Sequence, residues 1–238
     1  MISRFLLCLA ALCAGWMPVV RAQVATAAPA TTQAATSPAA HDFARWEKEI
    51  AAFEAKDRTS PPPKNGILFI GSSTIRMWKT LEQDYAGQPV INRGFGGSEI
   101  LDSTHFADRI VFPYHPKQIF LRAGGNDIHA GKSPEQVFAD FKDFVTTVHG
   151  KLATAEIVYI SISPAPSRWN EREANRQLND VIKSYAATHP GLKYVETYDM
   201  TLTPDGKARE ELFIADKLHF NADGYKLLAE RVRPFVGK

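Results

Sequence analysis

Residues 67–74 read Ile67-Leu68-Phe69-Ile70-Gly71-Ser72-Ser73-Thr74, an apolar run that ends in a glycine and three small hydroxyl residues. A short, unbroken apolar run is typical of a strand buried on both faces, as in parallel sheets. Similar runs recur at residues 90–91, 119–121, 157–160 and 194–195. The sequence therefore predicts several buried parallel strands, of which this stretch is the first.

Helical patterns lie between these runs. Apolar residues recur at helical spacing in the segment that contains Phe43, Trp46, Ile50 and Phe53. Ser133, Pro134 and Gln136 have the residue types of an N-cap, a first helical position and a capping box. Further helices are expected from about 168 to 189 and from 221 onward. Alternating strands and helices predict an α/β fold, whose active site lies beyond the carboxyl ends of the strands.

The first 22 residues have the pattern of a secretory signal peptide. Arg4 precedes an apolar run over residues 5–20, and Ala22 ends a cleavage-site pattern. The run has 16 residues, which is short for a membrane span of about 20. We therefore expect an exported protein, periplasmic or secreted, with an uncleaved anchor helix as the alternative and no stable membrane insertion after cleavage.

Cleavage after Ala22 would remove both cysteines, Cys8 and Cys13, and would leave a net charge of (28 − 2) − 26 = 0. The mature chain then has no cysteine nucleophile and no cysteine metal ligand. Residues 23–40 contain eight Ala, four Thr and two Pro, which predicts a flexible linker. Residues 41–238 are expected to form the folded domain. The absence of a basic excess gives no reason to expect a nucleic-acid partner.

Polar residues follow the apolar runs where an active site is expected. Acyl transfer needs a nucleophile, a base, a group that orients the base, and donors for the oxyanion. A serine after the first run, His219 as base and Asp216 three residues earlier would supply the first three. Glycines after the second run allow close approach of a backbone N–H, and Asn126 offers a side-chain donor. Each signal is weak alone, but together they are consistent with one site.

This ordered set resembles the SGNH hydrolases, also called the GDSL esterase/lipase family, over roughly residues 64–235. The resemblance rests on four segments, residues 69–74, 92–97, 124–127 and 216–219. It implies a three-layer α/β/α sandwich with five parallel strands in the flavodoxin-like order 2-1-3-4-5. It also implies an esterase that needs no cofactor or metal and acts on a small-molecule or glycan ester.

The resemblance assigns the site residues one by one. Ser73 is the implied nucleophile, with His219 as base and Asp216 as its acidic partner. Ser73, Gly97 and Asn126 form the implied oxyanion-binding group. The residue before the nucleophile, usually Asp in the family, is Ser72 here, so Ser72 stays the alternative nucleophile. The loops after the strands are short, which favours short-chain or carbohydrate-linked acyl esters.

Two other functions are compatible with parts of the sequence. One is a non-catalytic exported binding domain that retains the fold. The other is a metal-dependent hydrolase, for which the candidate ligands are Asp199, Asp216, His219 and Asp223.

The charged residues Arg93, Arg122 and Asp127 lie near predicted strand ends and have no role in the triad. Buried charge is costly unless it is paired, so we expect Arg93 or Arg122 to pair with Asp127 and support Asn126. Trp169 is expected either to form a pocket wall or to pack against a helix.

Overall fold

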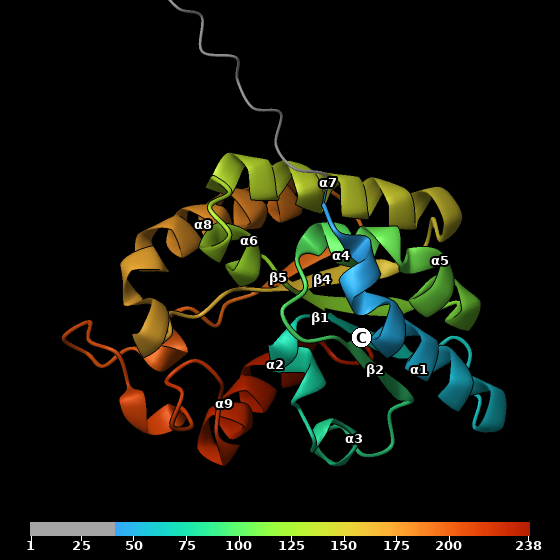
Figure 1. Cartoon of the computed structure of the whole chain (residues 1–238), viewed down its shortest axis with the longest axis horizontal. Helices are drawn as coiled ribbons and strands as arrows, with labels where there is room; N and C mark the ends of the chain where they lie inside the picture. Colours follow the sequence, from blue (N-terminus) through green and yellow to red (C-terminus); the bar gives the residue numbers. More distant parts are fainter. Residues whose placement is uncertain (1–40) are drawn as a thin grey trace, which may run out of the picture. The chain divides into compact units, whose positions relative to one another are not determined.

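The computed structural model describes residues 41–238 (Figure 1). The predictions of a signal peptide at 1–22 and a linker at 23–40 lie outside the described residues and stay predictions. Among residues 41–238, no helix is both long enough and apolar enough to cross a membrane.

Five parallel strands form one sheet in the order β2-β1-β3-β4-β5. The strands are β1 (Ile67–Gly71), β2 (Val90–Gly94), β3 (Gln118–Arg122), β4 (Glu156–Ile160) and β5 (Leu192–Val195). Each strand contains one of the apolar runs found in the sequence. The predicted five-stranded parallel sheet and its flavodoxin-like order are confirmed.

Helices connect and cover these strands. The α-helices are α1 (Glu47–Thr59), α2 (Ser73–Arg76), α3 (Leu81–Asp84), α4 (Ile100–His105), α5 (Ala107–Ile110), α6 (Gly125–His129), α7 (Pro134–Lys151), α8 (Arg172–Thr188) and α9 (Ala222–Val232). The 3₁₀ helices are η1 (Phe43–Trp46), η2 (Phe112–Tyr114), η3 (Pro166–Glu171), η4 (Asp199–Thr201), η5 (Glu210–Leu212) and η6 (Arg233–Phe235).

The sheet is the middle layer of three, with helices on both faces (Figure 1). Strand residues alternate between two cores because successive side chains of a strand point to opposite faces. Leu68 and Ile70 pack into the core that includes residues of α1, α4, α5, α7 and α8. Ile67 and Phe69 pack into the core that includes residues of α2, α3 and α9. This arrangement confirms the predicted α/β/α sandwich.

Local sequence signals mark several helix ends. Ser133 Oγ accepts from the N–H of Gln136, and Gln136 Oε1 accepts from the N–H of Ser133, so the predicted capping box starts α7. The helix expected from about 168 begins four residues later, because Arg168 has non-helical dihedral angles and kinks η3 before α8. The Arg168 guanidinium is thereby available for contacts outside the helix.

Gly71 ends β1 in a conformation that requires glycine. Its φ is +131°, and a Cβ there would lie 2.1 Å from the carbonyl oxygen of Arg122 on the neighbouring strand. A side chain would therefore push β1 away from β3 at the edge of the sheet where the polar residues gather.

Candidate active site

Three residues from distant parts of the chain form a chain of hydrogen bonds at the carboxyl edge of the sheet. His219 Nε2 lies 2.9 Å from Ser73 Oγ. His219 Nδ1 lies 2.6 Å from Asp216 Oδ2. If Nδ1 carries the proton, Nε2 presents its lone pair to the serine hydroxyl, which is the arrangement that general-base activation of a serine needs. Of the two adjacent serines, the structure joins Ser73 to the imidazole.

The turn over residues 216–219 holds the acid and the base together. Asp216 Oδ1 accepts from the N–H of Leu218 at 2.9 Å and from that of His219 at 3.0 Å. Lys217 has a φ of +57°, which lets the chain turn back within three residues. The turn is closed by the N–H of Ile214, which donates to the carbonyl of His219 at 2.9 Å.

These contacts also fix the charge of Asp216. Partial burial raises the pKa of this carboxyl, but the hydrogen bonds from the His219 ring and from two backbone N–H groups outweigh it and lower the pKa to about 2. Asp216 is therefore a carboxylate across the neutral range, and it can orient the His219 ring and stabilise an imidazolium.

Ser73 is the first residue of α2, directly after the extended Ser72. Ser72 holds this junction through its backbone, because its N–H donates to the carbonyl of Arg122 and its carbonyl accepts from Ile75 and Arg76. Tyr225 of α9 donates its hydroxyl to the carbonyl of Thr74 at 2.9 Å. The nucleophile candidate is thus held between the sheet and the last helix.

Asn126 lies at the start of α6, on the same small cavity as Ser73 and His219. Its Nδ2 donates to the carbonyl of Ser98 at 2.9 Å, which ties it to the loop that contains Gly97. Gly97 has a φ of +76°, and a Cβ there would lie 3.2 Å from the ring of Trp46. Gly97 directly precedes Ser98, whose carbonyl accepts the hydrogen bond from Asn126, so the two oxyanion candidates belong to neighbouring parts of the site.

Arg168 was not expected at the site, yet it contacts the amide of Asn126. Its Nη1 donates to Asn126 Oδ1 at 3.0 Å and to the carbonyl of Gly125 at 3.3 Å. This contact orients Asn126 so that Nδ2, the donor end, points away from the guanidinium. The only sequence signal was the position of Arg168, after the fourth apolar run and before a helix.

The expectation that Arg93 or Arg122 pairs with Asp127 is wrong. Arg93 instead forms an ion pair with Asp57 at 2.5 Å. Arg122 donates its Nη1 to the carbonyl of Ser161. Asp127 accepts from the N–H of Ile100 at 3.1 Å and lies 3.9 Å from Lys132 Nζ. The sequence suggested strand-end neighbours, but the acids that reach these sites come from elements that sequence spacing does not relate to them.

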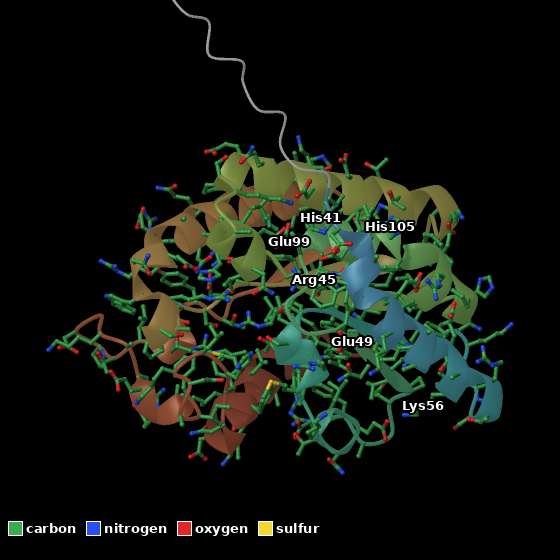
Figure 2. All side chains as sticks on the ribbon, in the orientation of Figure 1. His41, Arg45, Glu49, Lys56, Glu99 and His105 are labelled. Carbon is green, nitrogen blue, oxygen red and sulfur yellow. The ribbon has the colours of Figure 1, made fainter. Side chains whose placement is uncertain are left out.

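Asp127 has an unusual environment behind Asn126. Burial, together with the charge of Glu99, raises its pKa to about 7, although the Ile100 N–H and the Lys132 ammonium oppose the shift. Its Oδ2 has no hydrogen-bond partner among the described residues. Glu99 in turn lies beside His41, with 4.0 Å between Oε2 and Nδ1 (Figure 2).

The cavity beside Ser73 is small, about 60 Å³. Its walls include Ile162, Leu218 and the guanidinium-bearing residues Arg122 and Arg168. A larger hollow of about 460 Å³ lies between α1 and the α2–α3 segment. None of the three triad candidates lines that hollow, so the small cavity is the one that a reacting ester would enter.

The remaining candidates are dispersed. Trp169 lies under the guanidinium of Arg172, 4.8 Å from it, and does not line the cavity beside Ser73. Asp199 is 3.5 Å from Arg231, and Asp216 is engaged with His219. Within residues 41–238, no group of three or more His, Cys, Asp or Glu side chains is placed to hold a metal ion.

Comparison with known proteins is consistent with this geometry. Residues 71–227 match the sequence profile of the GDSL-like lipase/acylhydrolase family. The chain is 25% identical over 193 residues to the human platelet-activating factor acetylhydrolase IB subunit alpha1, covering 76% of this chain and 78% of that protein.

Solved structures share the fold. A GDSL-like lipase from Bacteroides thetaiotaomicron superposes with a TM-score of 0.65 at 19% identity, over 81% of this chain and 96% of that one. An acetylxylan esterase from Geobacillus stearothermophilus, solved as a catalytic mutant, superposes with a TM-score of 0.57 at 16% identity, over 74% and 96% of the chains.

The fold is an α/β/α sandwich with polar residues at the carboxyl edge of its parallel sheet, and the family match specifies the class of protein. The protein is a hydrolase of ester bonds. It belongs to the GDSL-like lipase/acylhydrolase family.

Proposed function

We propose that the protein is an exported serine esterase that hydrolyses short-chain carboxylic esters through Ser73, His219 and Asp216. The observation that carries this proposal is the hydrogen-bond chain Ser73 Oγ to His219 Nε2 to Asp216, at 2.9 and 2.6 Å. The proposed nucleophile, base and orienting acid are therefore in direct contact.

The reaction follows from these contacts in two half-reactions. Ser73 Oγ attacks the ester carbonyl while His219 Nε2 takes the hydroxyl proton, and the imidazolium then gives this proton to the departing alcohol oxygen. A water molecule attacks the acyl-enzyme by the same route and releases the carboxylic acid and Ser73. No cofactor takes part in either step.

The oxyanion of each tetrahedral intermediate needs hydrogen-bond donors. The Nδ2 of Asn126 and the backbone N–H groups of Ser73 and Gly97 are the proposed donors. Arg168 supports the role of Asn126 because it occupies Oδ1, the acceptor end of the same amide. The Nδ2 group has a second hydrogen beyond the one that it donates to Ser98, so it can serve the oxyanion as well.

The size of the cavity supports a short acyl group. About 60 Å³ beside Ser73 accommodates a few heavy atoms, far fewer than a fatty acyl chain has. One structural neighbour is an acetylxylan esterase, so a glycan-borne acetyl ester is a substrate of the proposed class. A series of 4-nitrophenyl esters from acetate to dodecanoate tests this, and kcat/KM should fall steeply as the chain lengthens.

A covalent serine probe distinguishes an esterase from a non-catalytic binding domain. A fluorophosphonate should label Ser73 in the purified protein, and peptide mass spectrometry locates the adduct. The Ser73→Ala variant should not react. No labelling in the folded wild-type protein would favour the binding domain, and loss of activity with a chelator would favour the metal-dependent alternative.

Export is a separate part of the proposal. It is supported by the charged, apolar and small-residue pattern of residues 1–22. Expressed in a bacterium that has a periplasm, the protein should be recovered outside the cytoplasm with Gln23 as its first residue. An intact N-terminus in the membrane fraction would instead indicate a retained anchor.

A further inference from the structure

Two small cavities adjoin each other next to the catalytic candidates. Each has about 60 Å³, and the second continues past the first toward Ser163, Asn175 and Phe220. Both are lined by Arg122 and Arg168. An ester bound at Ser73 would therefore have two guanidinium groups beside it.

Arg122 is buried without a matching negative charge. Its residue is 6% exposed, at the carboxyl end of β3. Nη1 donates to the carbonyl of Ser161, and Nε has no hydrogen-bond partner among the described residues. Within residues 41–238, the arginines that pair with carboxylates are all others, and no carboxylate oxygen lies within 4.0 Å of the Arg122 guanidinium.

Arg168 adds a second positive charge without an ion pair in the same part of the chain. It is partly buried, and it donates to the uncharged oxygens of Gly125 and Asn126. The carboxylate of Glu171, in the same 3₁₀ helix, is bound to His129 at 2.6 Å. The two cavities are therefore lined by two arginine side chains, and neither one forms an ion pair with a carboxylate of the described residues.

Burying a guanidinium without a partner is unfavourable, because it loses water and gains no ion pair. Burial lowers the pKa of Arg122 to about 10, which still leaves it a cation at neutral pH. An entering anion would supply what Arg122 lacks, and a planar carboxylate matches its fork of donors.

We propose that these joined cavities bind a carboxylate carried by the acyl group of the substrate, with Arg122 as its main partner and Arg168 as the second. The inference rests on the proposed esterase function and narrows its substrate to half-esters of short dicarboxylic acids. The acyl side is favoured because the cavities are small and lead inward from Ser73. The alcohol must leave past His219 and Asp216, whose side chains are 21% and 43% exposed.

The direct test compares two esters that differ only in charge. Monoethyl succinate carries the carboxylate on the acyl group, and ethyl succinamate replaces it by an amide of the same shape. Ethanol release measures kcat/KM for both. The wild-type protein should prefer the anionic ester by at least about tenfold, the factor that one additional charged contact typically gives. Equal rates or a preference for the amide would overturn the proposal.

Variants then assign the preference to Arg122. Arg122→Met should bring the ratio of the two kcat/KM values to about one, and Arg122→Lys should retain part of it. Arg172→Met is the matched control, because this exposed arginine donates to the carbonyl of Trp169, the residue after Arg168, and lines neither cavity. It should leave the ratio unchanged. Thermal unfolding shows whether Arg122→Met is folded. A folded Arg122→Met protein with an unchanged ratio of the two kcat/KM values would also overturn the proposal.

A second pair of esters distinguishes the acyl side from the alcohol side. Acetoxyacetate carries its carboxylate on the alcohol part, and 2-acetoxyacetamide is its neutral counterpart. We expect no preference within this pair. An Arg122-dependent preference here, and none for monoethyl succinate, would move the anion to the alcohol side and contradict the acyl assignment.

Failure of the esterase proposal is distinguishable from failure of this one. Ser73-dependent turnover of the neutral esters without any charge preference would retain the esterase and reject the anion site. If no ester is hydrolysed, calorimetry of the Ser73→Ala protein with monoethyl succinate still decides. Binding that Arg122→Met abolishes supports the site, and no binding rejects it.

Discussion

Ser72 and Ser73 are adjacent hydroxyl side chains with different surroundings. Ser73 Oγ contacts the imidazole of His219, whereas Ser72 engages its backbone in the start of α2. Ser73→Ala should lower kcat by on the order of 10⁶, the typical loss for a triad nucleophile. Steady-state ester hydrolysis measures the loss, and an unchanged thermal unfolding midpoint shows that the fold is intact.

Ser72→Ala is the matched control for this variant. It removes a hydroxyl one residue away and keeps the backbone hydrogen bonds of residue 72. We expect kcat within about tenfold of wild type, a factor that corresponds to 1.4 kcal/mol. An inactive Ser72→Ala together with an active Ser73→Ala would assign the nucleophile to Ser72.

Asp216 is tested by a substitution that keeps its shape. Asp216→Asn retains an oxygen for the turn but removes the charge that favours the His219 tautomer with its proton on Nδ1. By analogy with other triads, kcat should fall by up to about 10⁴. Since the pKa of Asp216 is lowered to about 2, the wild-type carboxylate stays ionised from pH 5 to 9, and the variant should be impaired throughout this range. Near-normal turnover would make Asp216 only a turn residue.

The elements around α6 contain a carboxyl group that tests pH-dependent stability. Asp127 is fully buried, and its pKa is raised from 3.8 to about 7. The unfolded chain ionises this group near pH 4, while the folded protein keeps its proton until about pH 7. The folded state therefore binds more protons in this window, and the group's contribution to stability falls as pH rises from 4 to 7.

Asp127→Asn should remove this slope. The wild-type protein should lose roughly 2–3 kcal/mol relative to the variant between pH 5 and pH 8, at about 1.4 kcal/mol per pH unit. Urea unfolding at both pH values measures the difference. Asp108→Asn is the control, because Asp108 is 71% exposed and should leave the slope unchanged. Parallel pH dependence of wild type and Asp127→Asn would show that Asp127 is ionised in the folded state.

Element boundaries were predictable where their causes are local. The capping box of Ser133 and Gln136 starts α7, because its two reciprocal hydrogen bonds span only three residues. The predicted start of α8, at about residue 168, is four residues early because Arg168 is non-helical. Its guanidinium contacts Asn126, 42 residues away in sequence. Sequence periodicity contains no trace of such a contact.

For the molecule as a whole, the strand-end rule predicts where the candidate site lies, and the family resemblance predicts which residues belong to it. The carboxyl edge of a parallel sheet brings Ser73 and Asn126 together, and a turn of three residues joins Asp216 to His219. The arginines could not be predicted, because their partners depend on tertiary packing. Arg122 ends an apolar strand, and this position is the one sequence signal that indicates a buried charge in need of a partner.

The ion pair between Asp57 and Arg93 joins the first helix to the sheet. Asp57, near the end of α1, accepts from Arg93 Nη2 at 2.5 Å and from the Tyr114 hydroxyl at 2.5 Å. Arg93 lies in β2 and is 5% exposed. Removing one partner of such a pair leaves a buried charge uncompensated and typically costs 3–5 kcal/mol.

Asp57→Ala should therefore destabilise the whole molecule without changing its chemistry. Asp57 is 19% exposed, which admits water to Arg93, so we expect a loss of roughly 2–3 kcal/mol and a melting temperature lower by about 4–12 °C. Glu47 lies on α1 like Asp57, and it is an exposed partner of Arg109 in α5. Glu47→Ala should lower the free energy of unfolding by less than about 1 kcal/mol. Scanning calorimetry measures both variants, and kcat/KM well below the transition should match wild type in each. Equal stability of the two variants would mean that Tyr114 and water compensate Arg93 fully, and that α1 is held to the sheet by its apolar face alone.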